Sequence, residues 1–584
     1  MTDRERTLRS ARWFGTRDVA GLIHRAYLKS EGFSGAAITG RPVVGICNSW
    51  SELVNCNLHF RALAQAVKRG VLQAGGLPLE FPVISLGEAL MKPTTMLYRN
   101  LMAMDVEESI RSNPLDAVVL LGGCDKTIPA PLMGAASVDI PTIVVTGGPT
   151  EPAVYCGRQL GAGTDLWRYT DDRRAGRITE AEYAEIEAAL VPSAGHCPEM
   201  GTASTMSSLV EALGMALPGS ASIPAVDARR YAMAETTGRR AVEMAWEGLR
   251  PSRILTSAAF ENAITLLMAL GGSTNAVVHL LALAGRVGVD VQLRTFDEIS
   301  RRTPMIANVR PSGEHLVEQL FHAGGVPAVM KELESLLHVE AVTVTGRTVQ
   351  ENIGSARVLD RNVIATVEAP FQPAGAIAVL RGSLAPQGAI IKQSAATKEL
   401  LKHRGLAVVF DDVYDLAARI DDPDLKVDAS SVLVLRNAGP KGGPGMPEWG
   451  QLPIPQKLLK QGVSDMVRLS DARMSGTSFG AVVLHVAPES AVGGPLGVVR
   501  DGDPILLDVE ARRLDLEIPT RELEERLARY QPRPPVYRRG YGAMYLEHVM
   551  QADQGCDFDF LRRIPGEPFE TQPLGLVGGP IGGW

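Results

Sequence analysis

Short apolar runs alternate with longer amphipathic segments from about residue 40 to residue 330. The runs read RPVVGIC, LEFPVIS, LDAVVLL and IPTIVVTGG, and the helical pattern NLHFRALAQAVKRGVLQAGG separates the first two. A short apolar run rich in β-branched residues is typical of a strand covered on both faces. Because these runs alternate with helical patterns, the chain predicts βαβ units and a parallel sheet with helices on both faces.

The pattern changes after about residue 340. Short β-rich segments such as GAIAVLRG, LAVVFDD, SVLVLRN and AVVLHVAP follow one another without long helices between them. Closely spaced strands of this kind predict a β-barrel or a β-sandwich. We expect an α/β fold class, with an N-terminal parallel-sheet α/β domain (residues 1–370) followed by a C-terminal β-barrel domain (residues 371–584). The aromatic and acidic tail after about residue 530 is expected to pack back as an ordered segment.

Composition narrows the class of protein. The 584 residues are 45% hydrophobic and 21% charged with a net charge of -7, which suits a large globular protein without a nucleic-acid or membrane partner. No window reaches the roughly 18 uninterrupted apolar residues of a membrane span, and the apolar stretch 254–285 reads as buried helices. The charged N-terminus lacks the apolar run of a signal peptide, so we expect a cytoplasmic protein.

The cysteines separate into two groups by their surroundings. Cys56, Cys124 and Cys197 lie among glycine or polar residues in predicted loops, in NSWSELVNCN, GGCDKT and SAGHCPEMGTAST. Oriented backbone N–H groups stabilise a thiolate in such loops, so these three are candidate metal or cluster ligands. The absence of a C-x-x-C pair argues against a zinc ribbon but not against ligands from distant loops. The other cysteines read as a packing residue on a strand, Cys47, or lack a metal-binding context, Cys156 and Cys556.

Acidic residues supply a second set of candidates. Glu88 and Asp125 each follow a predicted strand, Lys126 comes next to Asp125, and Glu448 follows the glycine-rich NAGPKGGPGMP. Ligands bind beyond the carboxyl ends of parallel strands, and magnesium prefers oxygen ligands from convergent loops. An acid of this kind taken alone is more often a helix cap or a solvated charge than a metal ligand, so only convergence in the fold would make a site.

Ser475 lies between a methionine and a glycine in LSDARMSGTSFG. Its hydroxyl and backbone N–H could face a bound anion, but the G-x-S-x-G pattern of a nucleophile elbow is missing. A turn serine that satisfies local backbone groups is the alternative. The nearby GPKGGPG matches neither G-x-x-x-x-G-K-[ST] nor G-x-G-x-x-G, so the sequence gives little support to a nucleotide site.

Six long segments in fixed order are together far more specific than any of these signals. They are SELVNCN, GGCDKTIPA, GGSTNAVVH, LRGSLAPQGAIIK, GPKGGPGMPE and SDARMSGTSFG, the last continuing to HVAPESAVGGP. From about residue 35 to its end the chain resembles the superfamily of dihydroxy-acid, 6-phosphogluconate and sugar-acid dehydratases. The resemblance implies an iron–sulfur hydro-lyase that converts a 2,3-dihydroxy carboxylate to a 2-keto acid through an enol, with the active site between an α/β and a β-barrel domain.

The resemblance also implies roles for particular residues. By motif position these are cluster ligands Cys56, Cys124 and Cys197; magnesium ligands Glu88, Asp125 and Glu448; Lys126, carbamylated in members with a 2Fe-2S cluster and counted among the metal-site and catalytic residues; and the general base Ser475. A 2Fe-2S cluster is favoured over a 4Fe-4S cluster, and Mg²⁺ is the second cofactor. The expected partner is a small hydroxy-acid substrate, and relatives form homodimers or homotetramers.

The branch of the superfamily is indicated by two segments. The tail YLEHVMQADQGCDFDFL and the stretch MGTASTMSSLVEALGMALPGSASIPAVDARR resemble sugar-acid dehydratases, such as those acting on arabinonate or xylonate. The alternatives are a dihydroxy-acid dehydratase of branched-chain amino acid biosynthesis and a catalytically silent iron–sulfur sensor or scaffold. The chain departs from its relatives around the third cysteine, where His196, Pro198 and Glu199 replace small residues.

Overall fold

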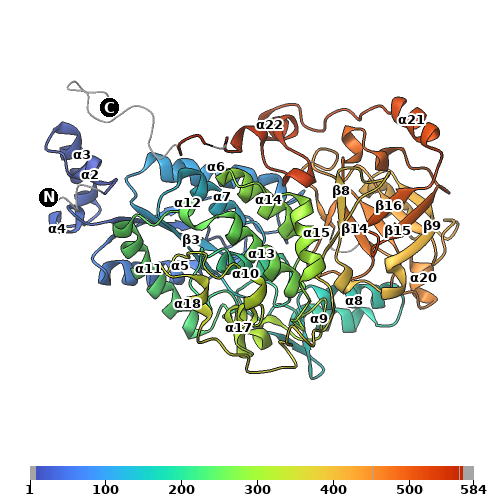
Figure 1. The fold of residues 1–584 in the computed structure, drawn as a ribbon, viewed down its shortest axis with the longest axis horizontal. Coiled ribbons are helices and arrows are strands. Elements are labelled where there is room, and N and C mark those ends of the chain that lie inside the picture. The colour runs from blue at the N-terminus through green and yellow to red at the C-terminus, as the bar shows by residue number, and fades with distance from the viewer. Residues whose placement is uncertain (1–7, 450–451, 565, 570–584) are drawn as a thin grey trace.

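The computed structural model describes residues 8–449, 452–564 and 566–569. Figure 1 shows an N-terminal part built mainly of helices around one sheet, and beside it a strand-rich C-terminal part. The last labelled helix, α22 (Gly540–His548), runs back over the N-terminal part. The chain therefore joins residues from both of its ends in one body.

The N-terminal part contains the predicted parallel sheet. Its four strands are β1 (Val43–Asn48), β2 (Leu77–Pro82), β3 (Ala117–Gly122) and β4 (Thr142–Thr146), in the order β2-β1-β3-β4. All three neighbouring pairs are parallel. Strands β1, β3 and β4 are buried along their whole length, which is why they read as uniformly apolar runs. The predicted sheet is confirmed.

Helices cover both faces of this sheet (Figure 1). They are α5 (Phe60–Gln73) and α11 (Ala228–Glu247) on one face, and α6 (Met96–Ser112) and α7 (Pro129–Val138) on the other. Glycines let α5 and α11 approach closely, because a Cβ at Gly70 would collide with the carbonyl oxygen of Glu235. The same holds at Gly238 against the carbonyl of Val67, so the two helix backbones nearly touch.

Two further helices form the centre of this part. α13 (Ser257–Ala269) and α14 (Asn275–Val287) are buried on almost every side, as their all-round apolar pattern predicts. α10 (Thr202–Ala212) packs against both of them. The remaining helices here are α2 (Ala11–Phe14), α3 (Val19–Ser30), α4 (Gly35–Ile38), α12 (Pro251–Ile254), α15 (Leu293–Arg302), α16 (Val317–His322), α17 (Gly325–Glu332) and α18 (Val349–Ile353). Within the described ranges, no helix is both long and apolar enough to cross a membrane.

An excursion between β4 and α10 forms a small unit of its own. It consists of the hairpin β5 (Ala153–Tyr155) and β6 (Arg158–Leu160) followed by α8 (Thr164–Arg174) and α9 (Glu180–Ala189). Ala153, Leu160 and Ile186 form its small apolar core. We call residues 150–190 the α8–α9 excursion.

The C-terminal part is a mixed sheet in the order β16-β15-β9-β10-β12-β14-β8-β7. Its eight strands are β7 (Ala378–Leu380), β8 (Gly388–Ile391), β9 (Lys402–Phe410), β10 (Val432–Leu435), β12 (Arg468–Ser470), β14 (Val482–Ala487), β15 (Pro504–Asp508) and β16 (Arg513–Leu516). The two edges meet, because Leu514 N–H donates to the carbonyl of Arg381 at 2.9 Å. The sheet is nearly closed around an apolar interior of its own. Three short helices flank it: α19 (Val413–Arg419), α20 (Gln456–Lys460) and α21 (Thr520–Ala528).

The C-terminal tail packs back onto the N-terminal part, as predicted. Helix α22 (Gly540–His548) and the residues after it bury Tyr545 and Phe558 in one apolar cluster with Leu97 of α6. Arg286 of α14 donates to Asp557 at 2.6 Å, and both side chains are fully buried. The tail is thus held to the first part of the chain by apolar packing and a buried ion pair.

Candidate active site

The candidate residues gather where the parallel strands end. The loop after β1 carries Cys56, the loop after β2 carries Glu88, and the loop after β3 carries Cys124, Asp125 and Lys126. Because parallel strands share one carboxyl edge, their following loops lie together. The topology therefore explains how residues up to 70 positions apart in the sequence reach one site.

Three carboxylates converge at this edge. One oxygen each of Glu88, Asp125 and Glu448 lies within 4.8 Å of the others. The fully buried Lys126 Nζ lies among them, at 3.1 Å from Glu88, 3.4 Å from Asp125 and 3.3 Å from Glu448. Three acids that converge this closely need a cation between them, and the Lys126 ammonium supplies one.

Glu448 reaches the cluster from the C-terminal half of the chain. It begins β11 (Glu448–Trp449), which pairs in parallel with β13 (Arg473–Met474) and places Glu448 beside Arg473. The buried guanidinium donates to Glu448 Oε2 at 2.7 Å and to Thr94 Oγ1 at 3.1 Å. Sequence reasoning missed Arg473, although it lies in the quoted SDARMSG segment.

Two hydroxyls fix the carboxylate of Glu88. Thr94 Oγ1 donates to Glu88 Oε1 at 2.8 Å, and Thr95 Oγ1 donates to Glu88 Oε2. Both threonines are buried. The pair was not anticipated, because a Thr-Thr step at the start of a helix ordinarily reads as capping.

The pKa values in the cluster are set by opposing effects. Burial opposes ionisation of Glu88, but Lys126, Arg473 and the two threonine hydroxyls lower the pKa of Glu88 to about 2. Burial, with Glu448 and Glu88 as like charges, raises the pKa of Asp125 to about 6. Burial and Arg473 disfavour the Lys126 ammonium, yet the three acids outweigh them and raise the pKa of Lys126. Asp125 thus takes up a proton more readily than Glu88.

Asn275 links the carboxylates to the core. Its Nδ2 donates to Glu448 Oε2 at 3.1 Å, to Thr202 Oγ1 at 2.9 Å and to the carbonyl of Met474 at 3.3 Å. Asn275 is fully buried at the start of α14. Its quoted segment, GGSTNAVVH, carries no local sign of this role, so sequence reasoning missed it as well.

The three loop cysteines lie close to one another and to the carboxylates. A hydrogen bond with Cys124, and then burial, raises the pKa of Cys56 well above its usual value. Loss of hydration raises the pKa of Cys197 well above its usual value, and the negative charges of Glu199 and Asp125 add to the shift. Solvent nevertheless reaches one side of the residue. The pKa is raised despite this exposure, because a thiolate that water touches on one side only is still poorly hydrated.

The other cysteines lie elsewhere. Cys47 is buried within β1, Cys556 is buried in the tail cluster, and Cys156 is exposed on the β5–β6 hairpin. Their positions agree with the interpretation of Cys47 as a packing residue and of the other two as having no metal context.

The unusual residues around Cys197 have structural partners. The buried Glu199 accepts hydrogen bonds from the backbone N–H groups of Gly163 at 2.7 Å and Thr164 at 2.6 Å, at the start of α8. His196 Nδ1 lies 3.0 Å from the carbonyl of Cys197, and burial lowers the pKa of His196 to about 4, so the ring is neutral. The Pro198 carbonyl accepts from Val317 N–H at 2.7 Å. Glu199 therefore ties the α8–α9 excursion to the third cysteine loop.

Ser475 follows β13 directly, two residues after Arg473. Its Oγ lies 2.8 Å from Thr477 Oγ1. Thr477 in turn contacts the α8–α9 excursion, since its carbonyl accepts from Thr164 Oγ1 at 2.8 Å and its Oγ1 from Trp167 Nε1 at 3.4 Å. Ser475 thus lies on a loop fixed from two sides.

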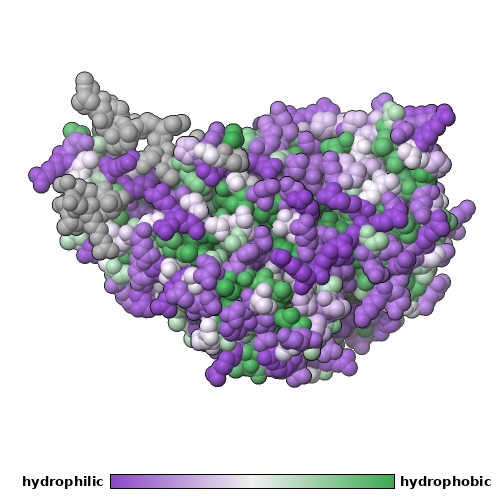
Figure 2. All heavy atoms as spheres, viewed as in Figure 1, coloured by the Kyte–Doolittle hydropathy of each residue, from purple (hydrophilic) through white to green (hydrophobic). Residues whose placement is uncertain are grey.

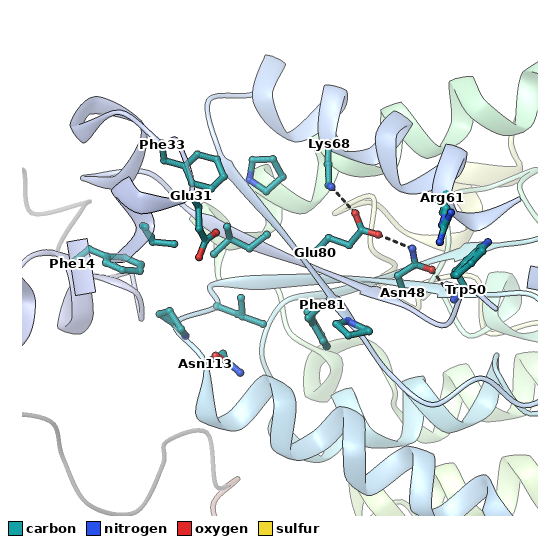
Figure 3. Close-up of a pocket in the computed structure, with 16 residues that line it drawn as sticks. Phe14, Glu31, Phe33, Asn48, Trp50, Arg61, Lys68, Glu80, Phe81 and Asn113 are labelled. Atoms are coloured by element: carbon teal, nitrogen blue, oxygen red, sulfur yellow. Dashed lines mark hydrogen bonds and ion pairs between the residues drawn. The ribbon is translucent and has the colours of Figure 1, made fainter. Parts of the chain in front are cut away.

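A surface pocket also occurs away from these residues. It measures about 790 Å³ and lies between the N-terminal helices α2–α3 and the edge strand β2. Figure 3 shows Lys68, Glu80 and Asn48 joined across it, with Arg61 stacked on Trp50. None of its lining residues belongs to the carboxylate or cysteine groups. We place the active site by its converging chemical groups and not by pocket size.

Comparison with known proteins shows the family of the chain. Residues 41–352 match the dihydroxy-acid/6-phosphogluconate dehydratase N-terminal model, and residues 362–556 match the corresponding C-terminal model. An L-arabinonate dehydratase of Rhizobium leguminosarum bv. trifolii is 52% identical, covering 96% of this chain and 97% of its own. An L-arabonate dehydratase of Azospirillum brasilense is 53% identical (95% and 97%), and a 6-deoxy-6-sulfo-D-gluconate dehydratase of Pseudomonas putida is 47% identical (97% and 98%). The chain therefore belongs to the dihydroxy-acid/6-phosphogluconate dehydratase family and is a hydro-lyase.

Proposed function

We propose that this enzyme removes water from C2 and C3 of a sugar acid, such as an aldopentonate, and yields the 2-keto-3-deoxy acid. The observation that carries the proposal is the convergence of Glu88, Asp125 and Glu448 on Lys126 beside a group of three cysteines. Three similar relatives bear names of sugar-acid dehydratases, which supports a sugar acid over a branched-chain dihydroxy acid.

The cluster of Glu88, Asp125 and Glu448 has the composition of a magnesium site. It offers hard oxygen ligands from three loops, and its negative charge exceeds what Lys126 alone neutralises. Glu88, Asp125 and Glu448 would hold Mg²⁺ together with Lys126, whose amine becomes an anionic oxygen ligand when carbamylated. The bound ion supplies Lewis-acid stabilisation of the negative charge that develops on the substrate.

The cysteine group has the composition of an iron–sulfur site. Cys56, Cys124 and Cys197 would hold a cluster, which we propose to be 2Fe-2S in preference to 4Fe-4S. When bound by these thiolates, such a cluster would supply the electrophile that a departing hydroxide needs. Glu199 and His196 hold the Cys197 loop in place through the contacts described above.

The protein side chains bind the substrate and move its proton. Ser475 Oγ is proposed as the base that takes the C2 proton, with Thr477 Oγ1 orienting it at 2.8 Å. Arg473 and Asn275 hold Glu448 in a single orientation, so that the carboxylates do not rearrange as charge builds up on the substrate.

Three further properties belong to the same proposal. The nearly closed C-terminal sheet is proposed to be the β-barrel of the family, supported by the hydrogen bonds between its two edges. We also propose, from the family resemblance, that the enzyme acts in the cytoplasm as a homodimer or homotetramer.

A substrate panel tests the function. Anaerobically prepared enzyme with Mg²⁺ is incubated with several aldopentonates and aldohexonates and with 2,3-dihydroxyisovalerate, and 2-keto acid formation is followed. We expect the highest kcat/KM with an aldonate, because buried groups that expect a hydroxyl penalise a substrate lacking it. A clear preference for dihydroxyisovalerate would assign the branched-chain activity instead. An iron-loaded protein that turns over none of them would support the sensor alternative.

A further inference from the structure

A buried lysine that does not belong to the cluster of Glu88, Asp125 and Glu448 lies beside the Ser475 loop. Lys392 follows β8 directly, and its residue is 8% exposed. Its Nζ donates to the backbone carbonyl of Gly476 at 3.4 Å. Within the described part of the chain, no carboxylate forms an ion pair with it. An ammonium has three donors, so this contact leaves most of its capacity unused.

Such a position disfavours the charged amine. A buried charge without a partner is expensive, and the group avoids the cost by losing its proton. Burial lowers the pKa of Lys392 to about 7, and no charged neighbour contributes to this shift. A large share of the side chain is then a neutral amine at neutral pH, with a lone pair that can accept a proton.

The serine loop is rigid at the point where Lys392 meets it. A Cβ at Gly476 would lie 2.5 Å from Ser273 Oγ and 2.8 Å from the backbone nitrogen of Thr202. The loop is therefore packed tightly against the start of α10 at this residue. Lys392 has a flexible four-carbon stem, and the carbonyl that its amine bonds belongs to the residue directly after Ser475.

We propose that Lys392 is a positioning residue that acts through Ser475 by accepting the proton of its hydroxyl. The inference rests on the proposed function, in which Ser475 removes the C2 proton. The Ser475 O–H bond breaks, its proton binds the Lys392 lone pair, and the alkoxide takes the C2 proton. The C2–H electron pair forms the C2–C3 double bond as hydroxide leaves C3. The Lys392 proton neutralises that hydroxide, so one water is released and both side chains return to their starting states.

A purely structural role predicts different behaviour. If Lys392 serves only to bond the Gly476 carbonyl, arginine at this position keeps a donor and should keep activity. If Lys392 must accept a proton, arginine fails, because a guanidinium does not deprotonate in proteins. The conservative substitution therefore separates the two roles.

The test uses the complete enzyme with cluster and Mg²⁺. The variants are Lys392→Met, Lys392→Arg, Ser475→Ala and the double variant Lys392→Met/Ser475→Ala. Lys402→Met is the control, since Lys402 lies on β9 with a side chain that is 77% exposed. Visible absorbance and thermal melting verify cluster content and folding. Turnover of the preferred substrate by the wild-type enzyme, measured first, decides the proposed function separately.

We expect both single Lys392 variants to lose about 10²-fold or more in kcat with an intact cluster and little change in KM. The double variant should be no slower than Ser475→Ala alone, since residues that act as a unit are not additive. The acidic limb of the wild-type kcat profile near pH 7 should be absent in Lys392→Arg. Near-normal kcat in either variant, or losses that multiply in the double variant, would overturn the proposal.

A second measurement needs no turnover. Competitive acetylation of the folded wild-type protein across pH, read by mass spectrometry of the peptide that contains Lys392, gives the titration midpoint of this amine. We expect a midpoint near 7 for Lys392. A midpoint near 10 at Lys392 would refute the proton-accepting role even if the enzyme acts on a different substrate from the one proposed.

Discussion

Arg473 and Glu448 lie side by side on the paired strands β13 and β11, with 2.7 Å between the guanidinium and the carboxylate. Arg473 also holds Thr94, which in turn holds Glu88. A single buried cation thus fixes carboxylates that arrive from the two halves of the chain. The geometry of the acidic group depends on this arginine even though it contributes no oxygen ligand.

Replacing Arg473 by methionine should lower the melting temperature strongly. Breaking a buried ion pair by removing one partner costs about 3–5 kcal/mol, because the other charge stays buried. Arg473→Lys, which keeps the charge, should lose less. Arg513→Met is the matched control, since its ion pair with Asp515 is mostly solvent-exposed on the arginine side and such pairs contribute about 0–1 kcal/mol. Equal melting temperatures for Arg473→Met and wild type would contradict this reading.

Magnesium binding should weaken as the pH falls through about 6. The pKa of Asp125 is raised to about 6, and a carboxylate must be ionised to bind a cation. Above this pH the Asp125 carboxylate is already ionised, whereas below it Mg²⁺ must displace the proton on Asp125. Titration calorimetry in two buffers of different ionisation enthalpy should detect proton release near pH 6 and little at pH 8.

The Asp125→Asn variant supplies the check on this assignment. Asparagine cannot ionise, so proton release near pH 6 should disappear while the remaining affinity becomes nearly independent of pH in that range. Proton release that persists in Asp125→Asn would assign the titration to another group.

The cysteines should differ sharply in their effect on the cluster. Serine at Cys56, Cys124 or Cys197 should each remove the visible absorbance of anaerobically purified protein, because a serine hydroxyl is a far poorer iron ligand than a thiolate. Cys156→Ser should leave it unchanged, since Cys156 is exposed on the β5–β6 hairpin. A colourless wild-type enzyme with full activity would rule out the cluster.

Glu199 should control the α8–α9 excursion. Glu199→Ala leaves the N–H groups of Gly163 and Thr164 without their acceptor, at a cost of about 1–3 kcal/mol for an unsatisfied buried group. We expect faster limited proteolysis within residues 150–190 and a larger change in KM than in cluster absorbance. Glu199→Gln keeps a carbonyl acceptor and should be milder, and Glu187→Ala, at an exposed position of α9, should have no effect. Equal proteolysis rates for all variants would remove Glu199 from this role.

The fold was predictable to the extent that it depends on local patterns. Strands β1, β3 and β4 are buried on both faces, so their sequences are uniformly apolar and easy to recognise. The order β2-β1-β3-β4 and the meeting of the C-terminal sheet edges at Arg381 and Leu514 depend on long-range pairing. No local pattern encodes such pairing. The domain boundary at residue 370 remains a prediction. The N-terminal family model ends at residue 352, and the C-terminal model begins at residue 362.

The site residues, like the fold, were predictable only in part. Asp125 and Lys126 could be found because they follow a recognisable strand, and the resemblance supplied the roles of Glu448 and Ser475. Arg473 and Asn275 could not be found, because each acts through one distant carboxylate that only the folded chain brings near. Lys392 ends the quoted segment LRGSLAPQGAIIK but carries no local sign of a role, and its burial in the fold is what singles it out.

Residues 555–557 of the tail supply contacts that two helices from earlier in the chain depend on. Asp557 pairs with Arg286, and the carbonyls of Gly555 and Cys556 accept hydrogen bonds from Arg99. During synthesis the two arginines therefore lack these partners until residues 555–557 have been made. Thr95 at the start of α6 and Asn275 at the start of α14 both contact the converging carboxylates, so residues 555–557 complete the support of the two helices on which these contacts depend.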